Sequence, residues 1–588
     1  MTAVDTPAVR SGGAVRAGEH AAIEALLRCF VLDHAVPVPE SGPLRLWLPD
    51  GGTITVDVRY RSVTGLHGFG AVSTADGAVG SAACLAAMLT GGDTDLVARV
   101  ADSAGRIDRY LRERGAEAAP VTRTVDEAPA AAGASAVVAP TVHGASVAGV
   151  APTVDGFLAA EQDLLLGHLL HPAAKSRDGI GPDEDARYAP ELRGRFPLHW
   201  FAVDPDLVRT GAVAHPALAA PLPDLFGGPA AGTRPVLPAH PWQATDLLHR
   251  PGFRALVDAG RIEPLGPAGP DWYPTSSLRT VYRPGHPVML KLSLGLRITN
   301  SRRENTPTEL ARGLEVQRLL AAGIAAPVAA AYPQFRIVAD PAYASVQHPD
   351  GTPTQLDVSV REAPPGLSAA RVLAGLVAPQ PGVRDATVVR LVRRLAAGGR
   401  AEAVAAEWVR RYVDRVLAPM VLLYASTGIG LEAHQQNTLV LLDDDGWPDT
   451  GWYRDNQGYY LATSALPAVL AATGAAGSTL AVTEDSMVDD RLTYYLLFNQ
   501  ALAPVSALGA AGVADERDLL GALRDGLRAI VARGHDTNGG LVRRWLTADR
   551  LPRKANLATR LAGIDEVLAP VDRQSVYRAV PNPLREAR

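Results

Sequence analysis

The sequence of 588 residues is poor in cysteine and has no excess of basic charge. Its only cysteines, Cys29 and Cys84, are too few for a disulfide framework and match no metal-ligand spacing, so we expect them to be buried structural residues. The formal net charge of −5 lacks the basic field that generic binding to nucleic acid requires. We therefore expect no nucleic-acid partner.

Long apolar segments are missing as well. The longest apolar run, LAPMVLLYASTGIGL, is shorter than a membrane span and contains polar residues. The first residues, MTAVDTPAVRSGG, do not show the charged segment followed by an apolar segment that marks a secretory signal. These absences predict a cytoplasmic protein without a membrane partner, and 47% hydrophobic and 20% charged residues are typical of a soluble globular protein. The length predicts about two to four domains.

Lysine is also scarce, because only Lys175, Lys291 and Lys554 occur among 57 lysine and arginine residues. Nearly every cation of this chain is arginine, so a retained lysine suggests a position that arginine cannot fill. A compact ammonium with three rotatable donors differs from a planar guanidinium where an oxyanion is bound. Three lysines left over by chance are the alternative. All three lie in polar, motif-like segments, which favours one anion-binding site.

The segment 271–305 predicts a β-hairpin that carries many polar groups. Two alternating runs, TSSLRTVY and PVMLKLSL, flank the turn signal Arg-Pro-Gly-His at 283–286. Hydroxyls, guanidinium groups and an ammonium are the groups that hold phosphate or carboxylate oxygens. We place Ser276, Ser277, Arg279 and Thr280 on the first strand, Lys291 and Ser293 on the second, and Thr299, Asn300, Arg302 and Arg303 after it.

A second polar segment is GHLLHPAAKSRDG, which should follow a helix (FLAAEQDLLL) that ends near Gly167. Two histidines three residues apart could suggest a metal site. No third ligand is near in the sequence, and Lys175 and Arg177 would repel a cation. We therefore interpret His168, His171 and Lys175 as part of a phosphate-contacting loop, with a merely structural loop as the alternative.

A third segment begins where a helix should stop at Gly428, with LEAHQQNTLVLLDDDGWPDTGWYRDNQGYY. Mg²⁺ favours a few protein oxygens together with nucleotide oxygens, and Glu432, Asn437 and Asp455 supply such oxygens around a predicted hairpin. Protein kinases use a similar arrangement, in which a strand lysine contacts the phosphates while a loop asparagine and an aspartate bind magnesium. Hairpin capping is the alternative for Asn437 and Asp455, and residues 443–445 are interpreted as a solvated turn.

Composition and periodicity divide the chain into five parts. Residues 1–17 are expected to be a disordered N-terminus, and 18–115 an α/β unit. Residues 116–154, rich in Ala, Val and Pro, form a low-complexity linker or insertion without chemistry. Residues 155–365 carry most of the predicted strands, including FRIVAD and QLDVSVREAP, and a helix capped by Thr306 or Thr308. Residues 366–588 are mainly helical from AARVLAGLVA onward, with apolar residues spaced as in core-facing helices.

These segments together resemble the NRPS-independent siderophore synthetases of the IucA/IucC family. The resemblance covers about residues 155–588 and rests on six motifs in the expected order: GHLLHPAAKSRDG, SSLRT, KLSLGLRITNSRR, EAHQQN, YRDNQG and RKANLATRL. Leu169 stands where the family usually has proline.

The resemblance implies an α+β fold like a cupped hand. An N-terminal thumb (18–115), β-rich fingers (155–365) and a mainly helical palm (366–588) would surround one deep cleft. It implies ATP-dependent adenylation of a polycarboxylate and condensation with an amine or hydroxyl to an amide or ester, with release of AMP and pyrophosphate. ATP and Mg²⁺ would be the cofactors. Citrate is favoured because Arg279, Arg302, Arg303 and Lys554 offer several cations, and family members are often homodimers.

The resemblance also implies roles for individual residues. Its nucleotide contacts map onto Ser277, Arg279, Thr280, Lys291, Arg303, His434, Gln436, Asn437 and Asp455, to which the predicted phosphate loop adds His168, His171 and Lys175. Its carboxylate contacts map onto Thr299, Arg303 and His434, with Lys554 close by. We expect Arg303, His434 and Lys291 to be catalytic, with Arg303 bridging the carboxylate and the α-phosphate, and Glu432, Asn437 and Asp455 to hold the metal.

Two other classes of function remain open on the sequence. A kinase-like phosphotransferase could use the Lys291 hairpin with Asn437 and Asp455, but EAHQQN has no aspartate where a kinase places its catalytic base. A non-catalytic binder of iron-citrate or nucleotide would not need the retained lysines. Product analysis separates these functions, because the synthetase releases AMP and pyrophosphate and a kinase releases ADP.

Overall fold

The computed structural model describes residues 16–118, 155–218, 227–229, 232–299, 301–455, 457–536, 540–565 and 569–587. Nearly all of the predicted disordered N-terminus, most of the predicted linker and Asn300 therefore lie outside the described residues. Helices and sheets alternate along the chain, in agreement with the α+β class. Within the described ranges, no helix is long and apolar enough to cross a bilayer.

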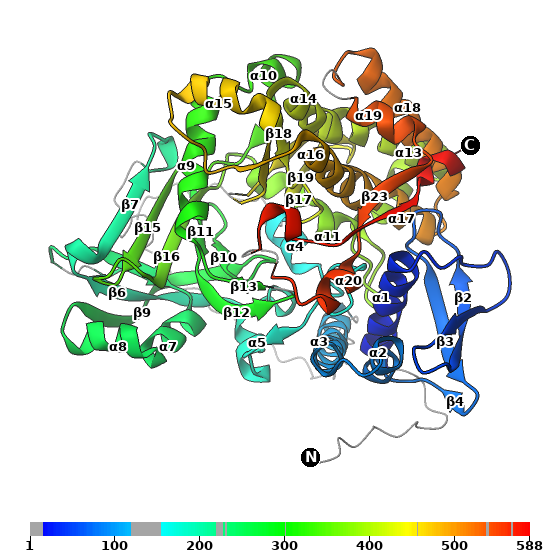
Figure 1. Ribbon diagram of the computed structural model, residues 1–588, viewed down its shortest axis with the longest axis horizontal. Helices are drawn as coiled ribbons and strands as arrows, with labels where there is room; N and C mark the ends of the chain where they lie inside the picture. The colour runs from blue at the N-terminus through cyan, green and yellow to red at the C-terminus, as the bar shows by residue number, and fades with distance from the viewer. Residues whose placement is uncertain are drawn as a thin grey trace, which may run out of the picture.

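The N-terminal part, drawn in blue at the lower right of Figure 1, packs helices against one face of an antiparallel sheet with the order β1-β2-β3-β4. Leu44, Leu46, Ile54 and Val56 alternate along β1 and β2 and are buried in this core. The elements are α1 (Ala17–Asp33), β1 (Leu44–Trp47), β2 (Thr53–Tyr60), β3 (Gly68–Thr74), β4 (Gly77–Ala78), α2 (Ala82–Thr90) and α3 (Thr94–Ala118).

The middle of the chain forms an eight-stranded antiparallel sheet, on the left of Figure 1, with the order β7-β15-β16-β11-β10-β9-β6-β8. A small sheet with the order β13-β12-β5 is formed by the same part of the chain. The strands are β5 (Arg177–Asp178), β6 (Phe196–Val203), β7 (Val208–Ala212), β8 (Val236–Ala239), β9 (Ile262–Pro274), β10 (Thr280–Tyr282), β11 (Val288–Leu292), β12 (Leu294–Ile298), β13 (Ser301–Arg303), β15 (Ala342–Gln347) and β16 (Pro353–Glu362). The helices are α4 (Gly156–Gln162), α5 (Pro182–Tyr188), α7 (Pro241–His249), α8 (Pro251–Asp258), α9 (Pro307–Ala321) and α10 (Ala326–Ala331).

The predicted hairpin exists, but its strands are shorter than predicted. In β10 and β11, Thr280 pairs with Lys291 and Val281 with Leu290. Residues 275–279 form a turn instead of a strand, because Leu278 has a left-handed φ of 61° and its N–H donates to the Thr275 carbonyl at 2.9 Å. The prediction that Ser276, Ser277 and Arg279 lie on a strand is therefore wrong. Ser293 lies between β11 and β12 and belongs to neither, so its predicted place on the second strand is also wrong.

The C-terminal part is mainly helical, at the upper right of Figure 1, with small sheets of the orders β14-β20-β19-β17, β18-β21-β22 and β23-β24. Its helices are α11 (Leu373–Val377), α12 (Thr387–Ala396), α13 (Ala401–Tyr412), the π-helix η5 (Val413–Leu417), α14 (Ala418–Thr427), α15 (Leu466–Thr473), α16 (Asp485–Leu492), the π-helix η7 (Thr493–Ala501), α17 (Leu502–Ala510), α18 (Glu516–Ala532), α19 (Leu541–Thr547) and α20 (Asn556–Leu561). Its strands are β14 (Arg336–Ile337), β17 (Ala370–Val372), β18 (Ile429–Leu431), β19 (Thr438–Leu442), β20 (Pro448–Tyr453), β21 (Tyr459–Ala462), β22 (Ala481–Thr483), β23 (Arg550–Lys554) and β24 (Tyr577–Pro581).

Helix ends follow local signals in several places. Thr306 caps α9 through a reciprocal box, since its Oγ1 accepts the Glu309 N–H at 3.2 Å and the Glu309 carboxylate accepts the Thr306 N–H at 2.9 Å. Gly428 ends α14 with a φ of 68°, as predicted. Two predictions were wrong: α4 ends at Gln162 instead of near Gly167, and residues 370–372 form β17, which pairs with β19, instead of a helical turn.

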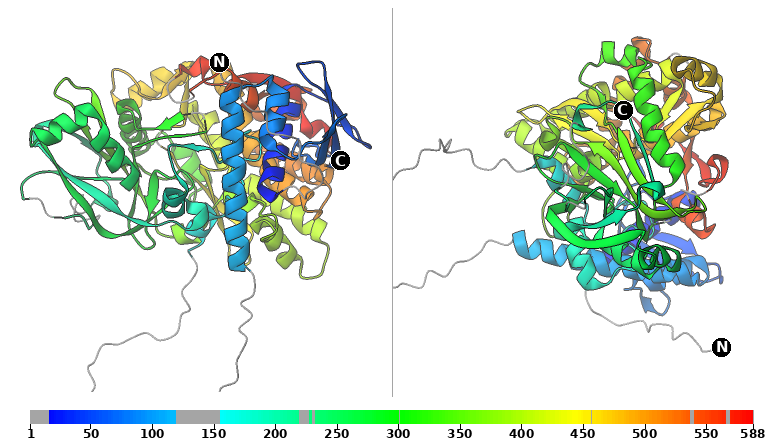
Figure 2. Two further views of the ribbon diagram at one scale, coloured as in Figure 1. Left: turned by 90° about the horizontal axis from the view of Figure 1, so that it is seen from below. Right: turned by 90° about the vertical axis from the view of Figure 1, so that its left-hand side faces the viewer.

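The parts of the chain pack closely against one another. Val316, Leu319 and Val328, on or beside α9 and α10, belong to the hydrophobic core of the C-terminal helices. At the other end, the Ala558 N–H of α20 donates to Asp33 at the end of α1 at 2.9 Å. In the left view of Figure 2 the long helix α3, in light blue, lies beside α1, against which it packs. The division into thumb, fingers and palm stays a prediction.

Candidate active site

One cavity of about 1020 Å³ is lined by all three parts of the chain, from Thr64 to Ser575. Arg302, counted above among the cations that favour citrate, is exposed and does not line this cavity. The residues to which the sequence analysis assigned individual roles do lie in its wall: His168, His171, Lys175, Ser277, Arg279, Thr280, Lys291, Thr299, Arg303, Glu432, His434, Gln436, Asn437, Asp455 and Lys554. The fold therefore brings these residues together, and their individual roles stay predictions.

The turn at 275–279 holds Arg279 deep in the wall. Its side chain is almost fully buried, and Nη1 donates to the Arg303 carbonyl at 2.8 Å and to Asn305 Oδ1 at 3.0 Å. Burial lowers the pKa of Arg279 to about 10, and the nearby Arg303 and Arg361 act in the same direction. A guanidinium with this little hydration favours an anionic partner.

Lys291 on β11 faces Asp455 just beyond β20. Its Nζ lies 3.1 Å from Asp455 Oδ1, and burial lowers its pKa to about 8, with Asp455 opposing the shift. Arg361 on β16 lies 3.8 Å from the same carboxylate oxygen and is held by two bonds to Asp340, at 2.7 and 2.9 Å. Lys291 and Arg361 form a cationic patch that shares Asp455, while Asp340 pairs with Arg361.

The segment between β18 and β19 carries His434 and Asn437. Burial lowers the pKa of His434 to about 4, so its imidazole is neutral at pH 7 before any ligand binds. Asn437 Nδ2 donates to the Glu432 carbonyl at 3.1 Å and lies 3.4 Å from His434 Nε2. These contacts fix the shape of the loop that was predicted to bind nucleotide and metal.

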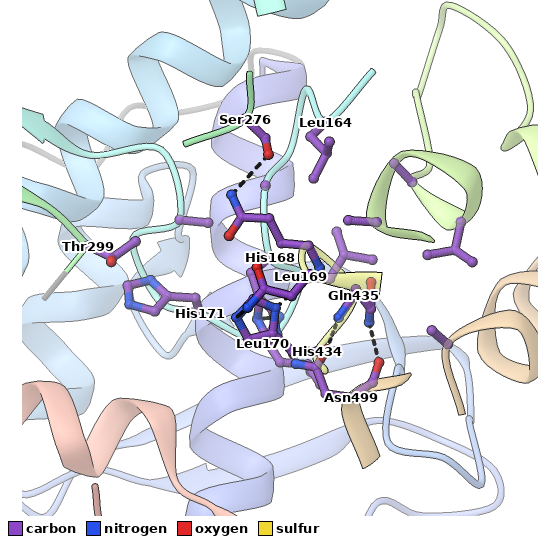
Figure 3. Close-up of a pocket in the computed structure, with 18 of the residues that line it drawn as sticks. Leu164, His168, Leu169, Leu170, His171, Ser276, Thr299, His434, Gln435 and Asn499 are labelled. Carbon is purple, nitrogen blue, oxygen red and sulfur yellow. Dashed lines mark hydrogen bonds between the residues drawn. The ribbon is translucent and has the colours of Figure 1, made fainter. Parts of the chain in front are cut away.

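His168 and His171 reach the same cavity from the loop after α4, and Figure 3 shows them with His434 between Ser276 and Asn499. The side-chain nitrogen of Asn499 lies 2.9 Å from His168 Nε2. Burial lowers the pKa of His168 to about 3, so this histidine is also neutral. Two neutral imidazoles therefore face the cavity.

Lys175 was predicted to contact phosphate, but its ammonium is paired within the protein. The buried ammonium contacts the Glu191 carboxylate, which also takes two bonds from Arg177 at 2.8 Å. Although burial opposes it, Arg177 and Lys175 hold the pKa of Glu191 at about 2. A buried ammonium needs a counter-charge, and Glu191 supplies it, so the geometry favours Lys175 as a support of the loop over a phosphate contact.

Arg303 and Thr299 form a small unit on the β12–β13 hairpin. Arg303 Nη2 donates to Thr299 Oγ1 at 3.0 Å and to the Ile298 carbonyl at 3.1 Å. Thr299 has a left-handed φ of 56°, which turns the chain between the two strands. Lys554, at the end of β23, lines the same cavity from the C-terminal part.

Several wall residues escaped the sequence analysis, among them Arg361, Arg454, Arg312, Gln457 and Asn499. Arginine is so frequent in this chain that no single one stands out. The available signal was the YRDNQG motif, which contains both Arg454 and Gln457.

The wall also offers an uncharged face. Ala503, Ser506, Ala507 and Ala510 line the cavity along α17, spaced three or four residues apart on one side of the helix. Ala510 is exposed and marks the outer end, whereas Ala503 is buried. Residues 377–383 form part of the same cavity wall.

The cavity wall holds oxygen ligands of the kind that magnesium prefers. Among the described residues there is no group of three or more His, Cys, Asp or Glu side chains that could hold a metal by themselves. Glu432, Asn437 and Asp455 nevertheless offer oxygens in one cavity beside cationic side chains. This fits an ion that is held mainly by phosphate oxygens and water, as Mg²⁺ often is.

Comparison with known sequences places these findings in context. The model of the IucA / IucC family matches residues 156–378, and that of "Ferric iron reductase FhuF-like transporter" matches residues 406–568. The rhizobactin siderophore biosynthesis protein RhbC of Rhizobium meliloti is 36% identical over 96% of this chain and 97% of its own length. The spermidine-citrate ligase of Bacillus anthracis is 36% identical over 73% of each chain.

A solved structure agrees with these matches. ATP-bound aerobactin synthetase IucA from a hypervirulent pathotype of Klebsiella pneumoniae superposes with a TM-score of 0.78 at 26% identity, covering 96% of this chain and 99% of the other.

Proposed function

Because the chain belongs to the IucA/IucC family of NRPS-independent siderophore synthetases, we propose that it is an ATP-dependent ligase that joins citrate to an amine in siderophore synthesis. The observation that carries the proposal is the gathering of Lys291, Arg279, Arg303 and Asp455 in one cavity from separate parts of the chain. The names of the relatives, among them a spermidine-citrate ligase, support citrate and an amine as substrates.

In the first half-reaction a carboxylate oxygen of citrate attacks the α-phosphorus of ATP, and pyrophosphate leaves. Two anions must approach each other, so cations in a site of low polarity provide the main stabilisation. Lys291, Arg279 and Arg361 surround the phosphates in this proposal. Arg303, oriented by Thr299, holds the carboxylate and the α-phosphate together and aligns them for in-line attack.

Magnesium, when bound, would neutralise charge on the phosphates, and Glu432, Asn437 and Asp455 would hold it. His434 and His168 are neutral before ligands bind. Two polyanions beside them would raise their pKa values.

In the second half-reaction the amine attacks the acyl carbon and AMP leaves. We propose that the amine enters along the uncharged face of α17. Asn499, which contacts His168, lies near the end of η7, and α17 continues from there for 9 residues, or about 13 Å at the α-helical rise. An extended amine chain can therefore lie along Ala503 and Ala507 while its nitrogen reaches the adenylate.

The match to the reductase family suggests a second candidate function that the sequence argues against. Cys29 and Cys84 both lie outside residues 406–568, so the matched segment has no thiolate that could hold an iron–sulfur cluster.

The test is citrate-dependent hydroxamate formation with hydroxylamine and ATP, compared across a panel of di- and tricarboxylic acids. The proposal expects AMP and pyrophosphate in step with hydroxamate, and greatly reduced activity in Lys291→Ala. Formation of ADP without hydroxamate would instead indicate a phosphotransferase. An acid other than citrate that gave the highest kcat/KM would reject the proposed substrate but keep the reaction.

A further inference from the structure

Glu161 on α4 joins two segments of the cavity wall. Its side chain is fully buried, and each carboxylate oxygen faces a different segment. Oε2 accepts the backbone N–H of Ser276 at 2.8 Å, and Oε1 pairs with the guanidinium of Arg454. Helix α4 therefore contacts both the turn before β10 and the segment after β20.

Arg454 extends this contact to the loop between β18 and β19. Its Nε and Nη2 donate to the Gln436 carbonyl at 3.2 and 2.9 Å, and its backbone N–H donates to the Asn437 carbonyl at 3.0 Å. Phe157 on α4 presents its ring face to the guanidinium, with 5.4 Å to the ring centroid. Arg454 is thus held by a carboxylate, an aromatic ring and two backbone carbonyls of one loop.

A fourth contact closes the ring. Gln436 Nε2 donates to Ser276 Oγ at 2.9 Å, the bond that Figure 3 draws at Ser276. The ring Glu161–Ser276–Gln436–Arg454 links the turn that carries Ser277 and Arg279 with the loop that carries His434 and Asn437. These two halves of the proposed nucleotide site are separated by 160 residues between Ser276 and Gln436.

Helix α4, which carries Glu161, is itself fixed by close backbone packing. Gly375 on α11 approaches this helix so closely that an added Cβ would lie 2.0 Å from the Ala160 carbonyl oxygen. Helix α4 is therefore seated directly against α11. Because a buried charge is stable only when paired and hydrogen-bonded, Glu161 and Arg454 also hold each other in place.

We propose that Glu161 and Arg454 are positioning residues that set the distance between the two halves of the nucleotide site. This inference rests on the proposed function for its effect on catalysis, but the geometric linkage stands on the contacts alone. A misplacement of about 1 Å at a reacting centre can lower a rate about a hundred-fold. The pair therefore acts on ATP through Ser277, Arg279 and Asn437 without contacting it.

The test variant is Glu161→Gln, which keeps the size and the acceptor for the Ser276 N–H but removes the charge opposite Arg454. We expect kcat/KM for ATP, measured by citrate-dependent ATP–pyrophosphate exchange well below the melting temperature, to fall about ten- to a hundred-fold. Hydrogen–deuterium exchange should become faster in residues 432–437, a loop that Arg454 holds. A merely structural role would lower Tm without these two effects.

Glu24 offers a matched control in the N-terminal part. Its Oε1 accepts the Phe69 N–H at 2.9 Å and its Oε2 pairs with Arg28 at 3.2 Å, the same pattern of contacts away from the cavity. Glu24→Gln should lower Tm and leave kcat/KM for ATP and exchange in 432–437 unchanged.

Wild-type kcat/KM and unchanged exchange in Glu161→Gln would overturn the inference, as would equal loss of activity in both variants at equal loss of Tm. If Glu161→Gln does not fold, Arg454→Lys is measured instead. The lysine keeps a positive charge for Glu161 but loses the two hydrogen bonds that Arg454 donates to the Gln436 carbonyl. A wild-type enzyme inactive with citrate would reject the proposed function, while the exchange measurement on 432–437 would still decide the linkage.

Discussion

The shared acid of the cationic patch leads to a prediction about pH. Burial lowers the pKa of Lys291 to about 8, and Asp455, 3.1 Å away, opposes this shift by favouring the ammonium. Only the ammonium can attract phosphate, so kcat/KM for ATP should decline as pH rises through this pKa. Asp455→Asn keeps the shape of the side chain and removes its charge. It should therefore move the alkaline limb of the profile to lower pH.

The size of the movement follows from the distance. An opposite charge this close shifts a pKa by about one to three units, so the pKa of Lys291 should reach about 7 or lower in Asp455→Asn. At pH 8 the wild-type lysine is about half protonated, and a lysine of pKa 7 is about one-tenth protonated. The smallest expected shift therefore costs about five-fold in kcat/KM at pH 8, with a smaller loss near pH 6.

Citrate-dependent ATP–pyrophosphate exchange between pH 6 and 9.5 measures this limb without a nucleophile whose own protonation would interfere. Lys291→Arg is the companion variant. Its guanidinium stays charged throughout, so the limb near pH 8 should vanish, and the plateau should drop because a planar fork does not replace the ammonium. If Asp455 served only the metal, Asp455→Asn would lower the whole profile and leave the limb near pH 8. That result would refute the reasoning.

Three further predictions concern the substrates and stability. Arg303→Ala should lower kcat and raise the apparent KM for citrate, a loss of about 2–4 kcal/mol in transition-state stabilisation, with little effect on the KM for ATP; a change confined to the KM for ATP would limit Arg303 to the nucleotide. Ala507→Leu should narrow the cavity beside the uncharged face of α17 and lower the rate of amide formation with long amines. The small nucleophile hydroxylamine should still report normal adenylation. The exposed Ala532→Leu is the control, and equal losses with both nucleophiles would contradict the assignment of this face. Burial raises the pKa of Asp357 from 3.8 to about 7, so the folded state binds the proton more tightly and the free energy of unfolding should fall as pH rises across this window. Asp357→Asn should flatten that decline in urea unfolding, and an unchanged slope would exclude Asp357 as its origin.

Local signals predicted local structure well. The capping box at Thr306 and the helix stop at Gly428 were readable because their causes lie within a few residues. Leu278 was not readable. Its left-handed backbone turns the chain before β10, and a leucine gives no signal for this conformation, which the surrounding packing imposes. The predicted first strand of the hairpin was therefore too long at its N-terminal end.

Long-range pairing was beyond the sequence. The scarcity of lysine drew attention to Lys175, Lys291 and Lys554, which all lie in the cavity wall. It could not predict that the Lys175 ammonium contacts Glu191, because this partner comes from a separate element after α5. Glu161 and Arg454 were missed for the same reason, since a buried acid in a short helix is recognisable only by what it pairs with.

The breadth of the cavity wall has a consequence for the newly made protein. Thr64 and Ser575 both line the cavity, so its wall needs residues from nearly the whole chain. At about 5–20 residues per second, about 25–100 s pass on the ribosome between these two residues. In the later part of this time Lys291 and its arginine neighbours are present without the strands that complete their enclosure, and the nascent chain cannot yet use ATP. Activity should therefore appear only when the last wall residues have left the ribosome and folded onto the first.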